Sequence, residues 1–121
     1  MNILEKIVLK KREWVAQQKA KMPLETVMQR SDYRRTTFSL LDKVRSSNDA
    51  AIIAEFKRKS PSKGNIFEQA DVVHVTTAYQ KAGASAISIL TDHDFFGGAD
   101  QDLIDARTLL SLPILRKDFI I

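Results

Sequence analysis

The 121-residue chain contains no cysteine, which excludes disulfide bonds and thiolate metal sites. No apolar run approaches the roughly 20 residues that a membrane-spanning helix needs. The amino terminus also lacks the small-residue cleavage site of a secretory signal. Hydrophobic residues make up 44% of the chain and charged residues 28%, which is typical of a folded domain rather than a disordered segment. We therefore expect a cytoplasmic, folded protein without a membrane partner.

The net charge of +4 is unevenly distributed along the chain. Residues 1–63 carry 15 Lys and Arg against 7 Asp and Glu, whereas residues 64–121 carry 4 against 8. A basic half of this kind is typical of a lysine-rich, solvated helical face. No RNA-binding aromatic pattern or zinc-finger spacing accompanies it, so we expect no nucleic-acid partner. An anionic small molecule remains a possible class of partner. The lysines around position 57 would bind it.

Helical periodicity dominates residues 1–49. A long first helix is expected with Asn2 as its cap, and a short second helix follows Pro23. A third helix is expected from about Phe38 to Val44, capped by Thr37. Trp14 lies on the apolar stripe of the first helix, where a core position is expected.

From residue 50 the pattern alternates between strand and helix. Strands are expected at about Ala51–Lys57, Ala86–Thr91 and Pro113–Phe119, and helices at about Asp71–Lys81 and Asp100–Leu110. This spacing fits successive βαβ units with parallel strands. We therefore predict an α/β fold: the amino-terminal part of a (β/α)8 TIM barrel, about strands one to three, at residues 50–121. A helical extension at residues 1–49 would precede it.

A complete barrel of this type needs about 250 residues. Only about two and a half of its units are expected here, and three parallel strands would leave two open edges. We therefore expect a truncated piece of a larger barrel, which could self-associate through its strand edges or need a complementary fragment.

Charged residues end the first and third expected strands. Residues 51–64 read AIIAEFKRKSPSKG, apolar on both faces at the start, and strand alternation then places Glu55 and Lys57 on one face. Lys117 mirrors Lys57 at the end of the third strand. Because the carboxyl ends of parallel strands are where α/β folds place their ligands, these three groups are expected to converge. An ammonium group there can protonate a substrate oxygen or bind a carboxylate, unless these lysines are simply solvated.

The loops after the first two strands carry weaker signals. Ser60 opens an SPSKG turn that could contact an anion, but the turn lacks P-loop spacing. The Asp92-His93-Asp94 run invites a metal site, yet no further ligand cluster supports one, so we predict none. Phe96 in the FFGG loop either packs beneath the loop or stacks on an aromatic substrate.

Three motifs in this order and spacing closely resemble those of indole-3-glycerol phosphate synthase: IIAEFKRKSPSKG, SILTDHDFFGG and SLPILRKDFII. The amino-terminal ILEKIVLKKREWVAQQK also resembles that family's helical extension. The resemblance implies a carboxy-lyase of tryptophan biosynthesis. Such an enzyme closes the ring of an anthranilate-derived aminodeoxyribulose phosphate, with loss of carbon dioxide and water, and uses no cofactor or metal.

The resemblance also implies roles for the charged residues. Lys57 matches the lysine that contacts the substrate carboxylate and takes part in proton transfer, and Glu55 matches the carboxylate beside it. Lys117 matches the general acid that acts on the substrate carbonyl. Lys59 and Ser60 match loop positions near the substrate, with Lys59 close to its phosphate.

Phe96 and Phe119 match apolar positions around the anthranilate ring. The family's second catalytic carboxylate and most of its phosphate site lie on later strands, so we expect the 121-residue chain alone to be inactive. Phosphoribosylanthranilate isomerase, a neighbouring phosphate-handling barrel, is the alternative within the same fold. The combination of Glu55, Lys57 and Lys117 argues against it.

Overall fold

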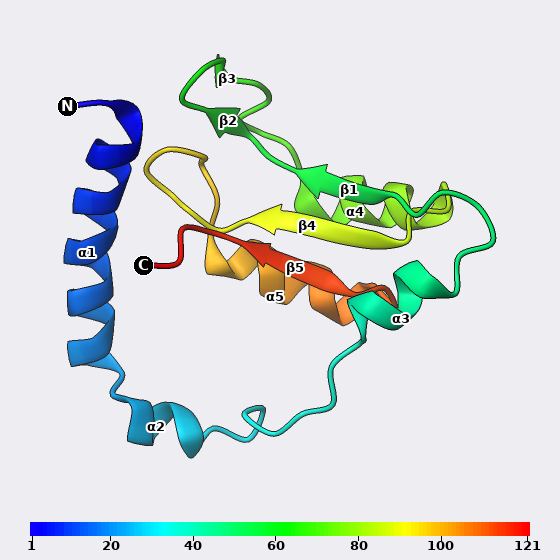
Figure 1. Ribbon diagram of the computed structural model, residues 1–121, viewed down its shortest axis with the longest axis horizontal. Coiled ribbons are helices and arrows are strands. Elements are labelled where there is room, and N and C mark those ends of the chain that lie inside the picture. The colour runs from blue at the N-terminus through cyan, green and yellow to red at the C-terminus, as the bar shows by residue number, and fades with distance from the viewer. The chain divides into compact units, whose positions relative to one another are not determined.

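The computed structural model describes all 121 residues, Met1–Ile121, in two compact units. The first unit comprises residues 1–37 and 119–121, and the second comprises residues 38–118. The helices and strands follow in the order α1 (Ile3–Lys21), α2 (Leu24–Met28), α3 (Leu40–Arg45), β1 (Ile53–Phe56), β2 (Lys59–Ser60), β3 (Gly64–Asn65), α4 (Val72–Lys81), β4 (Ala86–Leu90), α5 (Asp100–Leu109) and β5 (Ile114–Lys117) (Figure 1).

The first unit begins with a capped helix. The Asn2 side chain accepts a hydrogen bond from the Glu5 amide, and the Glu5 carboxylate accepts one from the Asn2 amide, both at 2.9 Å. This reciprocal pair is a capping box, which confirms the predicted start of α1. Pro23 begins α2. No helix in the structure is both long and apolar enough to cross a membrane.

The core position predicted for Trp14 is wrong. Trp14 is 39% exposed, and the Lys11 ammonium lies 4.9 Å from the centroid of its ring, a cation–π distance. Helical spacing identifies one face of α1, but it does not determine what covers that face.

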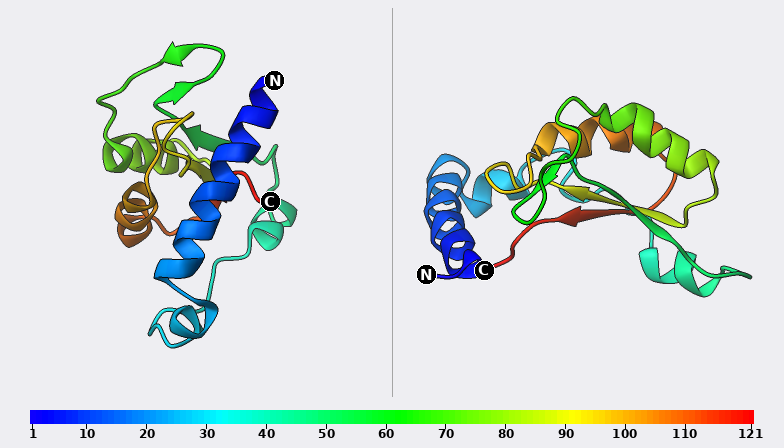
Figure 2. Two further views of the ribbon diagram at one scale, coloured as in Figure 1. Left: turned by 90° about the vertical axis from the view of Figure 1, so that its left-hand side faces the viewer. Right: turned by 90° about the horizontal axis from the view of Figure 1, so that it is seen from above.

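The second unit is built on a parallel three-stranded sheet in the order β1-β4-β5. In this register Glu55 pairs with Ser88, and Ser88 pairs with Leu115. Helices α4 and α5 cover one face of the sheet, as the view from above shows (Figure 2). The predicted alternation of parallel strands and helices is therefore confirmed. The domain boundary expected between residues 49 and 50 stays a prediction. The second compact unit contains α3 together with the strands.

The apolar core lies between the sheet and these two helices. All five residues of β4 are buried, because β4 is the central strand. The buried residues of the core cluster are Phe56, Ala70, Val72, Ile87, Ile89, Ala106, Leu110 and Leu112. Since strand side chains alternate, the residues between them point to the other face. Glu55, Ser88 and Lys117 are on that uncovered face, whereas Arg116 is on the helix-covered face.

Two local predictions differ from the structure. Burial on both faces was expected at the start of the first strand, but Ile52 and Ile53 are 59% and 47% exposed. The reason is that β1 is an edge strand and helices cover only one face of the sheet. The third helix starts at Leu40 rather than Phe38, and its cap is Ser39, whose hydroxyl accepts a hydrogen bond from the Asp42 amide. The predicted SPSKG turn is present, and it connects β2 and β3 in a small antiparallel hairpin.

The loop between β4 and α5 folds back onto the end of its own strand. The Gly98 amide donates to the Asp92 carbonyl at 2.8 Å, and the Gly97 amide donates to the His93 carbonyl at 2.9 Å. A Cβ atom on Gly98 would lie 2.0 Å from the Leu90 carbonyl oxygen, so no side chain fits at this position. The close approach therefore requires glycine.

We expect Gly98→Ala to lower the free energy of unfolding by about 3 kcal/mol or more, because the added methyl overlaps backbone atoms that cannot move independently. Gly83→Ala is the matched control. Gly83 has a φ of 95°, but a Cβ there meets nothing within 4 Å. Its cost is backbone strain alone, about 1–2 kcal/mol. Urea denaturation of both variants measures the difference, and equal losses would contradict the proposed overlap.

Candidate functional site

The Glu55 carboxylate joins the polar ends of all three strands of the sheet. The Ser88 hydroxyl on β4 donates to its Oε2 atom at 3.0 Å, and the Lys117 ammonium on β5 donates to the same atom at 3.3 Å. The Lys57 ammonium lies 3.7 Å from Oε1. Each side chain belongs to the face that α4 and α5 leave uncovered, so the predicted convergence of Glu55, Lys57 and Lys117 is observed.

The cluster is open to solvent. The side chains of Glu55 and Lys57 are about one third exposed, at 32% and 33%, and that of Lys117 is 53% exposed. Ion pairs this exposed contribute only about 0–1 kcal/mol to stability. Two ammonium groups around one carboxylate leave a net positive charge of one. The cluster therefore adds little to the stability of the fold, and its net charge suits it to bind an anion.

A largely buried ion pair lies beside this cluster, on the helix-covered face. Arg58 Nη2 donates to Asp102 Oδ1 at 2.9 Å, Nη1 donates to Oδ2, and Nε donates to the Ala70 carbonyl at 3.1 Å. Asp102 is 7% exposed. The hydrogen bonds to Asp102 raise the pKa of the Arg58 guanidinium above its ordinary value, against the opposing effect of burial. The pair ties the end of β1 to the first turn of α5.

The β2–β3 hairpin holds Lys59 and Ser60 outside the Glu55 cluster. The Ser60 hydroxyl is buried and accepts a hydrogen bond from the Lys63 amide at 3.2 Å, so it stabilises the turn. The stem of Lys59 lies against Gly97. Both residues of β2 thus have structural contacts, and neither is a partner of Glu55.

A polar hollow of about 270 Å³ lies between the hairpin and the β4–α5 loop. Its lining residues are Arg58, Lys59, Asn65, Glu68, His93 and Gly97. Arg58 forms an ion pair with Asp102, which neutralises its charge. Lys59 is the other cationic side chain in the lining, and no ion pair neutralises it.

The remaining predicted site residues lie in the connecting segments. Phe96 is half-buried in the β4–α5 loop. Phe119 is half-buried two residues beyond Lys117 and belongs to the first unit. Asp92 has a structural role, because its Oδ2 atom accepts a hydrogen bond from the Phe95 amide at 2.9 Å. No group of three or more His, Asp or Glu side chains is arranged to hold a metal ion.

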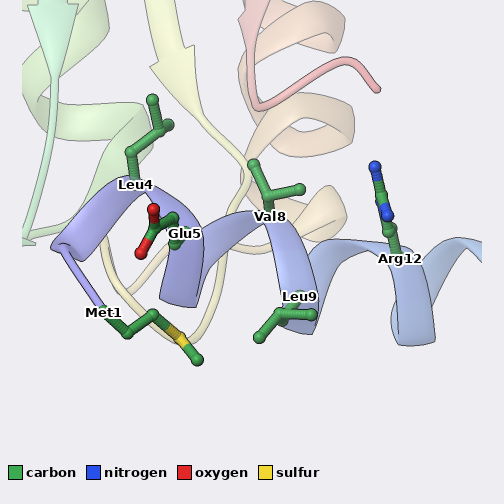
Figure 3. Close-up of a pocket in the computed structure, with 6 residues that line it drawn as sticks. All are labelled: Met1, Leu4, Glu5, Val8, Leu9 and Arg12. Carbon is green, nitrogen blue, oxygen red and sulfur yellow. The ribbon is translucent and has the colours of Figure 1, made fainter.

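A second hollow, of about 440 Å³, lies on α1. Figure 3 shows its lining: Met1, Leu4, Glu5, Val8, Leu9 and Arg12. It is mainly apolar, and its carboxylate, Glu5, is engaged in the capping box of α1. The hollow therefore has no group free for acid or base chemistry. The candidate site is the cluster at the strand ends.

Two participants were missed by the sequence interpretation. Ser88 lies within the apolar run ISIL, and strand pairing could have placed it opposite Glu55. Thr91, at the end of β4, accepts a hydrogen bond from Arg116 Nε at 3.2 Å and donates one to Asp118 Oδ2 at 2.7 Å. Its position directly after a buried strand could have indicated a role at the strand ends.

Comparison with known proteins identifies the family. The family model described as indole-3-glycerol phosphate synthase matches residues 4–121. The chain belongs to the indole-3-glycerol phosphate synthase family. This family is distinct from phosphoribosylanthranilate isomerase, the alternative within the same fold.

Curated proteins named indole-3-glycerol phosphate synthase agree with this assignment. The Bacteroides thetaiotaomicron protein is 44% identical over 99% of this chain and 46% of its own length. The Carboxydothermus hydrogenoformans protein is 43% identical over 98% of the chain and 47% of its own length. The Beutenbergia cavernae protein is 40% identical over the whole chain and 45% of its own length. The chain thus spans about half the length of these synthases.

We expect Asp102→Asn to lower the free energy of unfolding by about 3 kcal/mol, because it leaves the Arg58 guanidinium without its buried counter-charge. Asp49→Asn, in the exposed turn before β1, is the matched control and should change stability by less than about 0.5 kcal/mol. Chemical denaturation followed by circular dichroism makes the measurement. Equal stability of the two variants would show that the ion pair does not hold β1 to α5.

Proposed function

We propose that this chain supplies the lysine side of an indole-3-glycerol phosphate synthase active site. The observation that carries the proposal is the convergence of Lys57 and Lys117 on Glu55 at the carboxyl ends of parallel strands. Ligands of α/β barrels bind at this end of the strands. Membership of the family supports the assignment. On this proposal the protein is a carboxy-lyase of tryptophan biosynthesis. A cytoplasmic location and a reaction without cofactor are part of the same proposal.

The cluster suits the chemistry of ring closure. A ring carbon of the substrate attacks a carbonyl carbon, and negative charge develops on the carbonyl oxygen. The Lys117 ammonium, 53% exposed and held by Glu55, can donate a proton to that oxygen. Loss of carbon dioxide then restores the aromatic ring. In the last step the new hydroxyl takes up a proton and leaves as water, while the neighbouring carbon of the new ring loses a proton to form the double bond.

The other cation of the cluster is suited to the substrate's carboxylate. Lys57 interacts with Glu55 at 3.7 Å, a distance that leaves its ammonium hydrogens available to a second acceptor. A carboxylate placed between Lys57 and Lys117 would balance the net positive charge of the cluster. We assign Lys57 to carboxylate binding and to proton transfer.

The remaining assignments concern the phosphate and the aromatic ring. Lys59 faces the polar hollow of about 270 Å³, where its charge would attract the phosphate. Ser60 holds the hairpin that carries Lys59. Phe96 and Phe119 are the apolar groups assigned to the anthranilate ring.

We expect Lys117→Ala to lower kcat by about 10³-fold, within the range that a general acid contributes. Its melting temperature should stay close to that of the wild type, since the lost ion pair is exposed. Lys81→Ala is the matched control, because Lys81 is an exposed lysine at the end of α4. Steady-state kinetics with the anthranilate-derived substrate, using the protein expressed from its complete reading frame, make the comparison. Near-normal turnover of Lys117→Ala would refute the role.

A second proposal concerns the 121-residue chain by itself. Its sheet has two open edges, β1 and β5, and Ile53 and Leu115 are exposed on or near the uncovered face at 47% and 41%. Exposed strand edges with apolar side chains pair with other chains. We expect the isolated 121-residue chain to self-associate and to lack synthase activity. Size-exclusion chromatography with light scattering tests this, and a folded monomer at micromolar concentration would contradict it.

A further inference from the structure

Both sequence neighbours of Lys117 are bound to one buried hydroxyl group. Thr91, at the end of β4, is 6% exposed. Its Oγ1 atom donates to Asp118 Oδ2 at 2.7 Å and accepts a hydrogen bond from Arg116 Nε at 3.2 Å. The Thr91 amide also donates to the Lys117 carbonyl at 3.0 Å. The residue therefore contacts the backbone of Lys117 and the side chains on either side of it.

A second contact holds Arg116 from the helix side. Its Nη2 atom donates to Asp100 Oδ1 at 3.0 Å, and Asp100 is the first residue of α5. The Asp100 side chain is 62% exposed, so this contact is weaker than the buried one. Together the contacts form a chain from α5 through Arg116 and Thr91 to Asp118.

These contacts lie on the face of the sheet opposite to the one that Lys117 occupies. Successive side chains in a strand project to opposite faces, so fixing Arg116 and Asp118 on one face directs Lys117 to the other. On that face Lys117 reaches Glu55 Oε2 at 3.3 Å. Lys117 is the last residue of β5. Side-chain anchors on both sides of it hold the backbone where the regular strand ends.

We propose that Thr91 is a positioning residue for Lys117, acting through Arg116 and Asp118; this rests on the proposed function, in which Lys117 is the general acid. Threonine suits the task because its hydroxyl both donates and accepts, and because its branched Cβ restricts the side-chain rotamer. Serine retains the hydroxyl, whereas valine retains the shape and loses both hydrogen bonds.

The kinetic test compares Thr91→Val with Thr91→Ser. We expect Thr91→Val to lower kcat about tenfold or more with KM within about twofold, because a misplaced acid slows the chemical step more than it weakens binding. Thr91→Ser should retain kcat within about threefold, since it keeps the donor and the acceptor. Thr77→Val is the matched control: the Thr77 hydroxyl bonds within α4, to the Val73 carbonyl at 2.6 Å. A Thr91→Val variant with wild-type kcat would overturn the proposal, even if its melting temperature fell.

A second readout does not depend on turnover. Acetic anhydride labelling of Lys117, quantified by mass spectrometry, reports how firmly its ammonium is held by Glu55. We expect labelling of Lys117 to be about threefold faster in Thr91→Val and unchanged in Thr77→Val, since an exposed ion pair of about 0.5–1 kcal/mol slows the reaction by roughly that factor. Equal labelling rates in Thr91→Val and the wild type would overturn the proposal.

The two readouts separate the inference from the proposed function. Absence of turnover in the wild-type protein would refute the function, and the labelling rates alone would then decide whether Thr91 positions Lys117. If Thr91→Val does not fold, Asp100→Asn replaces it, because Asp100 is exposed and holds the same arginine. Faster labelling of Lys117 in Asp100→Asn would support the anchor, and an unchanged rate would overturn it.

Discussion

The structure of the candidate site depends on one carboxylate, that of Glu55, which binds groups from all three strands of the sheet. Ser88 on β4 donates to it directly, and Lys117 reaches it across β4 from the other edge strand. This reach is possible because the strands are parallel and in register, so that Glu55, Ser88 and Leu115 are paired neighbours. With the carboxylate removed, the ammonium groups would repel each other and lose the group that holds them at the same point.

Sequence reasoning could place this cluster because it depends on two regular properties. Strand side chains alternate with a period of two, and βαβ connections make successive strands parallel. Those properties put Glu55, Lys57 and Lys117 on one face and at one end, whatever the packing details. Ser88 follows from the same rules once the register is known. The capping box at Asn2 was readable for a similar reason, because it involves residues three positions apart.

Features that depend on distant partners could not be predicted in this way. The exposure of Trp14 and Ile53 depends on what packs against their elements, and hydrophobic periodicity carries no such information. The hairpin after β1 depends on amides of the following segment, which donate to the Arg58 carbonyl. The ion pair between Arg58 and Asp102 joins residues 44 positions apart, and its geometry depends on side-chain rotamers. The tertiary structure, not the local pattern, determines each of these.

The first turn of α5 connects the two lysine strands through the face opposite the site. Its N-cap residue, Ala99, provides no side-chain cap, and Asp100 and Asp102 instead bring negative charge to the positive end of the helix. The same carboxylates bind Arg116, which precedes Lys117, and Arg58, which follows Lys57. Because neighbouring residues of a strand point to opposite faces, arginines anchored on the helix side leave both lysines directed to the open side. The arginines need their charge to bind α5 and the lysines need theirs to meet an anion, and the sheet keeps these two uses on separate faces.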